Sequence, residues 1–239
     1  MNLILLEPHE LTDGEAVVTD RRARHIAEVI RPAVGDTLRV GVLGGAQGEA
    51  RVLTIVPDSV RLALRLTGPP PPRPRVHLVL AVPRPKVLGR VLQTVGALGV
   101  ARLDLVNAWR VEKSYFGSPA LEPAAIRQAL VLGAEQGATT WLPPCAVHDR
   151  LMSYLAAPPA EPALRVVAHP KSSAPLESVV PPGPADCLVA IGPEGGWIER
   201  EVQTFEARGF VPITLGAAIL RTEQAVAVLL GQLALLERL

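Results

Sequence analysis

The chain contains few cysteines and few aromatic residues. Two of its 239 residues are cysteine, Cys145 and Cys187, and 3% are aromatic. The two cysteines lie far apart and form no CxxC or Cys/His spacing, so neither zinc nor another metal is predicted. Isolated cysteines of this kind are typical of reduced thiols in a cytosolic protein. Because aromatic residues are scarce, leucine, valine and alanine must build most of the hydrophobic core.

Long hydrophobic runs and a strong net charge are also absent. No apolar stretch reaches the roughly 20 residues that a membrane helix needs, and residues 1–7 lack the basic region and apolar run of a signal peptide. We therefore expect a cytoplasmic protein with no membrane partner. The formal net charge of +1 neither supports nor excludes a nucleic-acid partner. Lysine occurs only at positions 86, 113 and 171, and this excess of arginine fits either codon bias in a GC-rich genome or RNA binding.

Several common catalytic motifs are missing as well. The sequence has no GxxxxGK followed by Ser or Thr, no GxGxxG after an early strand and no GxSxG. These absences argue against a P-loop NTPase and an ordinary Rossmann dinucleotide or methyl-donor site, and the chain lacks the nucleophile elbow of an α/β-hydrolase. The five histidines form no HExxH or paired spacing. We therefore interpret each lone histidine as structural or exposed rather than as a ligand.

A proline-rich segment divides the chain. Gly68–Arg75 has the composition of a stiff, extended linker, which predicts an N-terminal domain at residues 1–70 and a C-terminal domain at residues 74–239. The N-terminal part is predicted to be mostly β, with a hairpin turn at Gly44-Gly45. Its expected strands are Ala16–Val18, Thr37–Val42, Glu49–Ile55 and Ser59–Leu66. This pattern favours a small β-barrel interrupted by one helix.

That helix carries a group of basic residues. Asp20 is the expected N-cap, and an apolar face is expected from Ala23, Ile26, Ala27 and Ile30. The basic residues off this face are Arg21, Arg22, Arg24, His25 and Arg31. They form either a candidate contact with RNA phosphates or a simple solvated helix face.

The C-terminal part alternates strands and helices. Strands are predicted at Val76–Val82, Leu103–Val106, Leu164–Ala168, Cys187–Ile191 and Val211–Leu215. Helices are predicted at Lys86–Leu98, which Gly99 ends, at Pro123–Gln136, around Ile198–Phe205, which Gly209 ends, and at Glu223–Leu239. This alternation is typical of an α/β domain with a parallel sheet and helices on both faces.

Two predicted strands each run into a turn of glycines and small residues, which leaves backbone groups open to a ligand. The first turn carries Glu194 where a phosphate cradle would carry a basic residue, which favours a neutral or cationic ligand. In the second turn, Ile219 and Leu220 could wall an apolar slot for a planar base. The candidate ligand-binding residues are Ile191, Gly192, Pro193, Glu194, Gly195, Gly196, Leu215, Gly216, Ala217, Ile219 and Leu220.

The final predicted helix begins with polar residues and continues as an apolar one. Thr222 is the expected N-cap, and Arg221 before it is hard to explain by packing, so we expect it to hold a phosphate or a developing negative charge. Glu223 is a weaker candidate for a base or an orienting group, or a carboxylate favoured by the helix dipole. The rest of the helix is apolar around most of its circumference, which predicts a homodimer packed through it, with C2 symmetry as the default.

At these two turns the sequence resembles the RsmE family of SPOUT methyltransferases, which methylate N3 of a uridine in 16S ribosomal RNA. The matching residues are Ile191–Gly196, Glu199, Glu201, Gly209-Phe210, Leu215-Gly216 and Ile219–Glu223, with weaker matches at His25, Val29–Arg31, Gly35-Asp36, Leu98–Val100 and Ala134–Gln136.

The resemblance implies an N-terminal PUA-like β-barrel that binds RNA and a C-terminal domain with a trefoil knot. It also implies S-adenosylmethionine bound by main-chain groups in the knot, a small ribosomal subunit or 16S rRNA as partner, and a homodimer that shares the RNA site. In this family's reaction uridine N3 attacks the methyl carbon and loses its proton, and we assign stabilisation of the negative charge to Arg221.

The sequence departs from the family pattern at Thr94, Ala97, residues 137–139 and Gln224. Several of these positions are polar or basic in the family, whereas the two turns are intact. Two alternatives therefore stay open: a SPOUT methyltransferase that acts on a ribose 2′-OH or on tRNA, and a non-catalytic RNA-binding paralogue.

Overall fold

Two compact units make up the chain. The computed structural model describes residues 1–56, 58–159, 162 and 164–239. The N-terminal unit comprises Met1–Pro72 and Val131–Leu142, and the C-terminal unit comprises Arg73–Leu130 and Pro143–Leu239. The boundary at Pro72 falls inside the proline-rich segment. Residues 131–142, which our division of the sequence placed in the second domain, belong to the first unit because Leu3, Leu5 and Ala134 share a buried apolar cluster.

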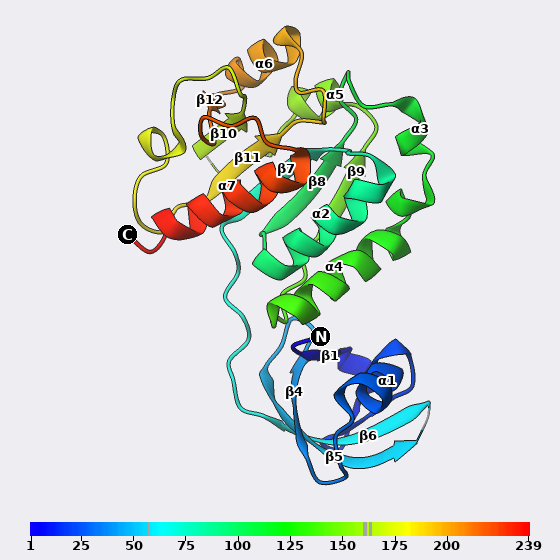
Figure 1. Cartoon of the computed structure of the whole chain (residues 1–239). Helices are drawn as coiled ribbons and strands as arrows, with labels where there is room; N and C mark the ends of the chain where they lie inside the picture. The colour runs from blue at the N-terminus through cyan, green and yellow to red at the C-terminus, as the bar shows by residue number, and fades with distance from the viewer. Residues whose placement is uncertain (57, 160–161, 163) are drawn as a thin grey trace. The chain divides into compact units, whose positions relative to one another are not determined.

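The N-terminal unit contains a six-stranded sheet with the order β1-β4-β5-β6-β3-β2. Figure 1 shows that this sheet is curled. β1 runs parallel to β4, and the other neighbours are antiparallel. The four predicted strands are confirmed, and Gly44-Gly45 lies in the turn between β4 and β5. The strands are β1 (Ile4–Leu6), β2 (Leu11–Thr12), β3 (Glu15–Val18), β4 (Thr37–Val42), β5 (Gln47–Val56) and β6 (Ser59–Leu66), with a 3-10 turn at η1 (Pro8–Glu10).

The predicted basic helix forms as α1 (Arg21–His25) followed by a π-helical turn, η2 (Ile26–Ile30). Asp20 is its N-cap, as predicted, because its side chain accepts a hydrogen bond from the Arg22 backbone N–H. The buried face differs from the prediction. Arg22 is buried beside Ala23 and Ile26, whereas Ile30 is exposed, because the π-helical turn shifts the last residues away from α-helical spacing.

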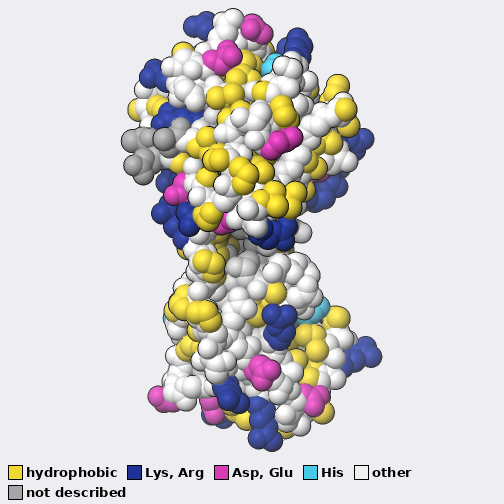
Figure 2. Space-filling model, turned by 90° about the vertical axis from the view of Figure 1, so that its left-hand side faces the viewer, with side chains coloured by type: hydrophobic (Ala, Val, Ile, Leu, Met, Phe, Trp, Pro, Cys, Tyr) yellow, Lys and Arg dark blue, Asp and Glu magenta, His cyan; other side chains and the backbone are white. Residues whose placement is uncertain are grey.

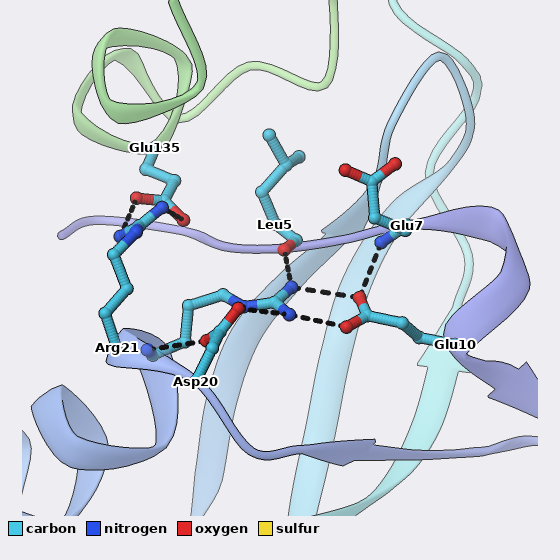
Figure 3. A network of polar contacts seen from close by, with 7 residues as sticks. Leu5, Glu7, Glu10, Asp20, Arg21 and Glu135 are labelled. Carbon is cyan, nitrogen blue, oxygen red and sulfur yellow. Dashed lines mark hydrogen bonds and ion pairs between the residues drawn. The ribbon is translucent and has the colours of Figure 1, made fainter. Parts of the chain in front are cut away.

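A partly buried ion-pair network explains why Arg22 lies inside. Figure 3 shows its partners Leu5, Glu10 and Asp20. Its guanidinium group contacts the carboxylates of Glu10 and Asp20 and donates to the Leu5 carbonyl oxygen. Burial alone would raise the pKa of both carboxylates, but hydrogen bonds from Arg22 outweigh it and lower them. Arg22 therefore connects α1 to Leu5 in β1 and to Glu10 in η1, which precede it in the sequence by more than ten residues.

The neighbouring Arg21 is paired as well. Its two terminal nitrogens donate to the Glu135 carboxylate oxygens at 2.8 and 2.9 Å, and the Glu135 side chain is almost fully buried. The Glu135 carbonyl oxygen also accepts bonds from the backbone N–H groups of Asn2 and Leu3. Glu135 thus fixes residues 131–142 within the N-terminal unit (Figure 3).

The C-terminal unit is built on a parallel six-stranded sheet with the order β12-β10-β11-β7-β8-β9. Strands β7, β8 and β11 are buried almost throughout, so both faces of the sheet are covered, as predicted. Helices α2 and α7 pack side by side in front of it in Figure 1. The strands are β7 (Val76–Ala81), β8 (Arg102–Val106), β9 (Cys145–His148), β10 (Leu164–Ala168), β11 (Cys187–Ile191) and β12 (Val211–Ile213).

The long predicted helices all form, with small shifts at their ends. They are α2 (Pro85–Leu98), which Gly99 caps, α4 (Pro123–Gly137), which contributes to both units, α6 (Glu199–Glu206) and α7 (Thr222–Leu236). Short helical segments that the sequence did not predict are α3 (Lys113–Phe116), α5 (Leu151–Ala156), η3 (Pro119–Leu121) and η4 (Leu176–Ser178). Across the described residues, no helix is long and apolar enough to cross a membrane.

A fully buried carboxylate lies on one face of the C-terminal sheet. Asp104 accepts hydrogen bonds from Arg102, from Nε2 of His77 and His148, and from the Tyr154 hydroxyl. Burial alone would raise the pKa of Asp104, but these donors outweigh it and hold the pKa well below its usual range. The ionised carboxylate can only accept, so both imidazoles must donate from Nε2. We call these five residues the Asp104 cluster.

Candidate functional site

The two glycine-containing turns meet at one pocket of about 230 Å³ at the carboxyl ends of β10, β11 and β12. In open parallel sheets, ligands bind outside the carboxyl ends of the strands. All eleven candidate ligand-binding residues line the pocket. The complete lining is residues 168–170, 191–197 and 214–220, with Thr222 and Ala225.

The first turn brings its backbone close to a tryptophan. A Cβ atom on Gly192 would lie 3.2 Å from the buried Trp197 ring, so a larger residue would require this ring to shift by a few tenths of an ångström. The turn closes where the Gly196 N–H donates to the Pro193 carbonyl oxygen at 2.8 Å. The sequence therefore uses glycine here to let backbone and indole pack together.

The second turn is shaped by glycine and by a hydroxyl group. Gly216 has a φ of +133°, which other residues rarely adopt. The Thr214 hydroxyl donates to the Gly216 carbonyl oxygen at 2.9 Å, and the Gln232 side chain donates to the Leu215 carbonyl oxygen. Ile219 lines the pocket but is 85% exposed. It therefore lies at the mouth of the pocket, and its role as an apolar wall for a planar base stays a prediction.

Glu194 is exposed at the rim of the pocket. One of its carboxylate oxygens accepts a hydrogen bond from the backbone N–H of Arg84, the N-cap of α2, at 3.0 Å. This bond ties the first turn to α2. The carboxylate adds negative charge to a pocket whose described lining residues include no lysine or arginine, which fits a neutral or cationic ligand.

The two candidate catalytic residues lie beside the pocket in sequence but do not line it. Arg221 is exposed and is the N-cap of α7, a place that we had assigned to Thr222. Thr222 is instead the first helical residue, and it is buried. The Gln224 side chain accepts a hydrogen bond from the Arg221 N–H and so caps the start of the helix. Glu223 lies 3.4 Å from the guanidinium group of Arg90.

The pocket also contains residues that the sequence did not indicate. His169 follows β10, and its buried Nδ1 has no hydrogen-bond partner within the part of the chain that the structure describes; the same is true of Trp197 Nε1. A buried polar atom without a partner costs free energy. We had interpreted His169 as one lone histidine among five, although its place at a strand's carboxyl end was a usable signal.

The basic residues of α1 and η2 divide into two groups. Arg22 is buried in its ion pairs with Glu10 and Asp20, so we correct its assignment as an RNA contact. Arg21 is exposed although it pairs with Glu135. Arg24 and Arg31 are also exposed and His25 is half-buried, so these four residues stay candidates.

No group of three or more His, Cys, Asp or Glu residues among those described could hold a metal ion. Both cysteines are free thiols, and burial raises the pKa of each to about 12, which disfavours the reactive thiolate. The pocket itself offers backbone N–H and C=O groups and a few polar side chains.

Comparison with known proteins identifies the family. Residues 69–234 match the family model described as an RNA methyltransferase domain. The chain belongs to this family. It is 29% identical over 94% of its length to ribosomal RNA small subunit methyltransferase E of Treponema pallidum, of which the match covers 87%. It is 25% identical to the Borreliella burgdorferi protein of the same name, numbered 1, with 94% of each chain covered. The resemblance to the RsmE family is thus confirmed.

The fold of this RNA methyltransferase is also found in solved structures. The crystal structure of ribosomal RNA small subunit methyltransferase E from Neisseria gonorrhoeae, bound to S-adenosylmethionine, superposes with a TM-score of 0.81. It is 22% identical, and the match covers 99% of this chain and 98% of that one. Both the curled sheet and the parallel sheet therefore belong to the shared architecture.

Proposed function

We propose that this methyltransferase transfers the methyl group of S-adenosylmethionine to N3 of a uridine in 16S rRNA of the small ribosomal subunit. The observation that carries the proposal is the shared pocket of the two turns, at the strand ends where the fold favours a ligand. The names of the relatives support the substrate, and the donor bound to the Neisseria enzyme supports the cofactor. The proposal keeps the cytoplasmic location expected from the sequence.

The residues of the pocket fit the methyl donor. A nucleoside and an amino-acid group both need hydrogen-bond partners, and the turns offer backbone N–H and C=O groups together with His169 Nδ1. The negative charge of Glu194 at the rim suits a ligand with a sulfonium cation. When bound, S-adenosylmethionine would supply an electrophilic methyl group.

The charged residues beside the pocket would act on the RNA base. Uridine N3 loses its proton as it attacks, which leaves negative charge on the uracil ring. The exposed Arg221 side chain can approach such a ring or a neighbouring phosphate, because the capping bonds use the backbone N–H and carbonyl oxygen of Arg221. Glu223 is oriented by Arg90 and is the candidate base or orienting group.

The finer points of the fold belong to the same proposal. We assign the curled sheet of the N-terminal unit to a PUA-like barrel that binds RNA, and we assign a trefoil knot to the C-terminal unit. Arg21, Arg24, His25 and Arg31 are the candidate phosphate contacts, because these residues are exposed or half-buried.

We further propose a homodimer packed through α7. One side of α7 is buried within the C-terminal unit, but Ala227, Gly231, Ala234 and Leu235 are exposed on the other. Figure 2 shows hydrophobic side chains gathered over one face of this unit. Leu235→Glu should convert the dimer to monomers in sedimentation measurements, because it places a charge in an apolar contact. A wild-type protein that sediments as a monomer at all concentrations would rule the dimer out.

The function is tested by changing Arg221 to Ala. We expect S-adenosylmethionine to bind with unchanged affinity, while methyl transfer to protein-free 16S rRNA or to small subunits from cells lacking the gene falls about 100- to 1,000-fold, the usual cost of one charge-stabilising donor. Arg200→Ala is the matched control, because Arg200 is exposed on α6 outside the pocket. Normal turnover of Arg221→Ala would refute the role.

The same assay separates the alternatives. Mass spectrometry of the modified nucleosides would distinguish a base from a ribose product and rRNA from tRNA. A wild-type protein that binds S-adenosylmethionine but methylates no RNA would be the non-catalytic paralogue.

A further inference from the structure

Aromatic residues are concentrated in one segment next to the pocket. The chain has three tryptophans, two tyrosines and three phenylalanines. Trp109, Tyr115 and Phe116 all fall within residues 109–116, between β8 and η3, together with Arg110 and Lys113. We call residues 109–116 the aromatic segment. Interleaved basic and aromatic side chains are typical of surfaces that bind single-stranded nucleic acid.

Two contacts hold the start of this segment against the first turn of the pocket. The buried Glu201 carboxylate accepts from the Trp109 N–H at 2.8 Å and from the Ile198 N–H, at the start of α6, at 2.9 Å. The Arg110 guanidinium group donates to the carbonyl oxygen of Gly195, which lines the pocket. The backbone beside Trp109 is therefore fixed relative to the pocket.

The side chain of Trp109 points away from the core. It is 79% exposed, whereas Trp197 in the same unit is 4% exposed. An exposed indole loses the large stabilisation that burial gives an aromatic side chain. The ring of Trp109 does not pack in the core although its backbone is held in place. Contact with a ligand explains this exposed position better than packing does.

We propose that Trp109 is a stacking platform for an unpaired base of the substrate RNA. Unpaired bases stack on exposed aromatic rings, and this contact tolerates any base because each has a π-face. The exposed Lys113 supplies positive charge for a phosphate in the same segment. The inference rests on the proposed function, since it places the RNA beside the methyl donor.

The first test is direct binding. A short single-stranded oligouridylate should quench the tryptophan fluorescence of the wild-type protein, and Trp109→Phe should abolish most of this quenching while the oligouridylate still binds. Trp141 and Trp197 remain as internal references, because neither is fully exposed. Equal quenching in Trp109→Phe would overturn the assignment.

The second test is kinetic and uses protein-free 16S rRNA. Trp109→Ala should raise KM for RNA about 5- to 150-fold, which corresponds to the loss of one stacked base, with a much smaller change in kcat. Trp109→Phe should restore most of the affinity because it keeps a ring. Met152→Ala is the matched control, since it also removes an exposed apolar side chain in the same unit. Binding of S-adenosylmethionine should be unchanged in all three variants.

The outcomes separate this inference from the proposed function. If the wild-type protein methylates RNA and Trp109→Ala does so equally well, only the stacking role fails. If no RNA is methylated but oligouridylate quenches Trp109, the methylation proposal fails and the stacking role stands. A defect of Trp109→Ala on assembled subunits but not on protein-free rRNA would assign the segment to a protein contact and overturn the inference.

Discussion

Among the described residues of the C-terminal unit, buried polar atoms occur both in the pocket at the strand ends and in the Asp104 cluster on the sheet face. In the cluster, each oxygen of Asp104 accepts hydrogen bonds from the surrounding side chains. In the pocket, His169 Nδ1 and Trp197 Nε1 are buried and have no partner among the described residues. Satisfied groups stabilise the fold, whereas unsatisfied ones are available to a ligand.

Removing the buried carboxylate should give the largest effect. Asp104→Ala should lower the free energy of unfolding by about 3–5 kcal/mol, because Arg102 and two imidazoles lose their common acceptor. Denaturant unfolding followed by circular dichroism measures this loss. The folded variant should bind S-adenosylmethionine with unchanged affinity, since the cluster residues do not line the pocket.

The matched control is Asp186→Asn. Its carboxylate is 66% exposed and lies 3.5 Å from Arg75, so we expect a loss of at most about 1 kcal/mol. If Asp104→Ala were no more destabilising than this control, the cluster would not be a stabilising network, and the contrast with the pocket would be lost.

Acid should weaken the Asp104 cluster in the wild-type protein. The pKa of Asp104 is lower in the folded than in the unfolded chain. The contribution of this carboxylate to the free energy of unfolding is therefore fully present above its unfolded-state pKa, and it is lost as the pH falls through its folded-state pKa. Stability should therefore fall below about pH 5, and Asp104→Ala should show a smaller fall. Equal acid profiles of the two proteins would contradict this account.

Local patterns in the sequence predicted most of the sheet. The expected bounds of β4, β6, β10 and β11 agree with the structure because each strand is a clear apolar or alternating run. The four-residue β9 and the short α5 were missed, since such segments are too short to show a period. Their neighbours in the sheet and the Asp104 cluster hold them in place.

At the candidate site, too, local sequence patterns predicted some features and missed those that depend on distant residues. Glycine and small residues between strand and helix indicated both turns of the pocket, and the structure brings them together. The burial of Arg22 was not predictable from helix periodicity, because it depends on Glu10, twelve residues away. His169 was missed because a single histidine carries no spacing signal, and only the order of the strands brings it beside both turns.

A change at His169 should give the smallest effect and the sharpest contrast with Asp104. His169→Phe should raise the Kd for S-adenosylmethionine about fivefold, the value of one hydrogen bond of about 1 kcal/mol. Its free energy of unfolding should hardly change, because Nδ1 has no partner to lose within the described chain. Calorimetry and denaturant unfolding measure the two quantities.

His169→Asn separates the polar atom from the ring. Asparagine can place a polar atom near the position of Nδ1, so it should recover much of the affinity that His169→Phe loses. An unchanged affinity in both variants, together with a clear loss of stability, would make His169 a structural residue like those around Asp104. The pocket and the Asp104 cluster would then both be stabilising groups of polar residues. The unpartnered nitrogen of His169 would no longer be evidence for a ligand at the strand ends.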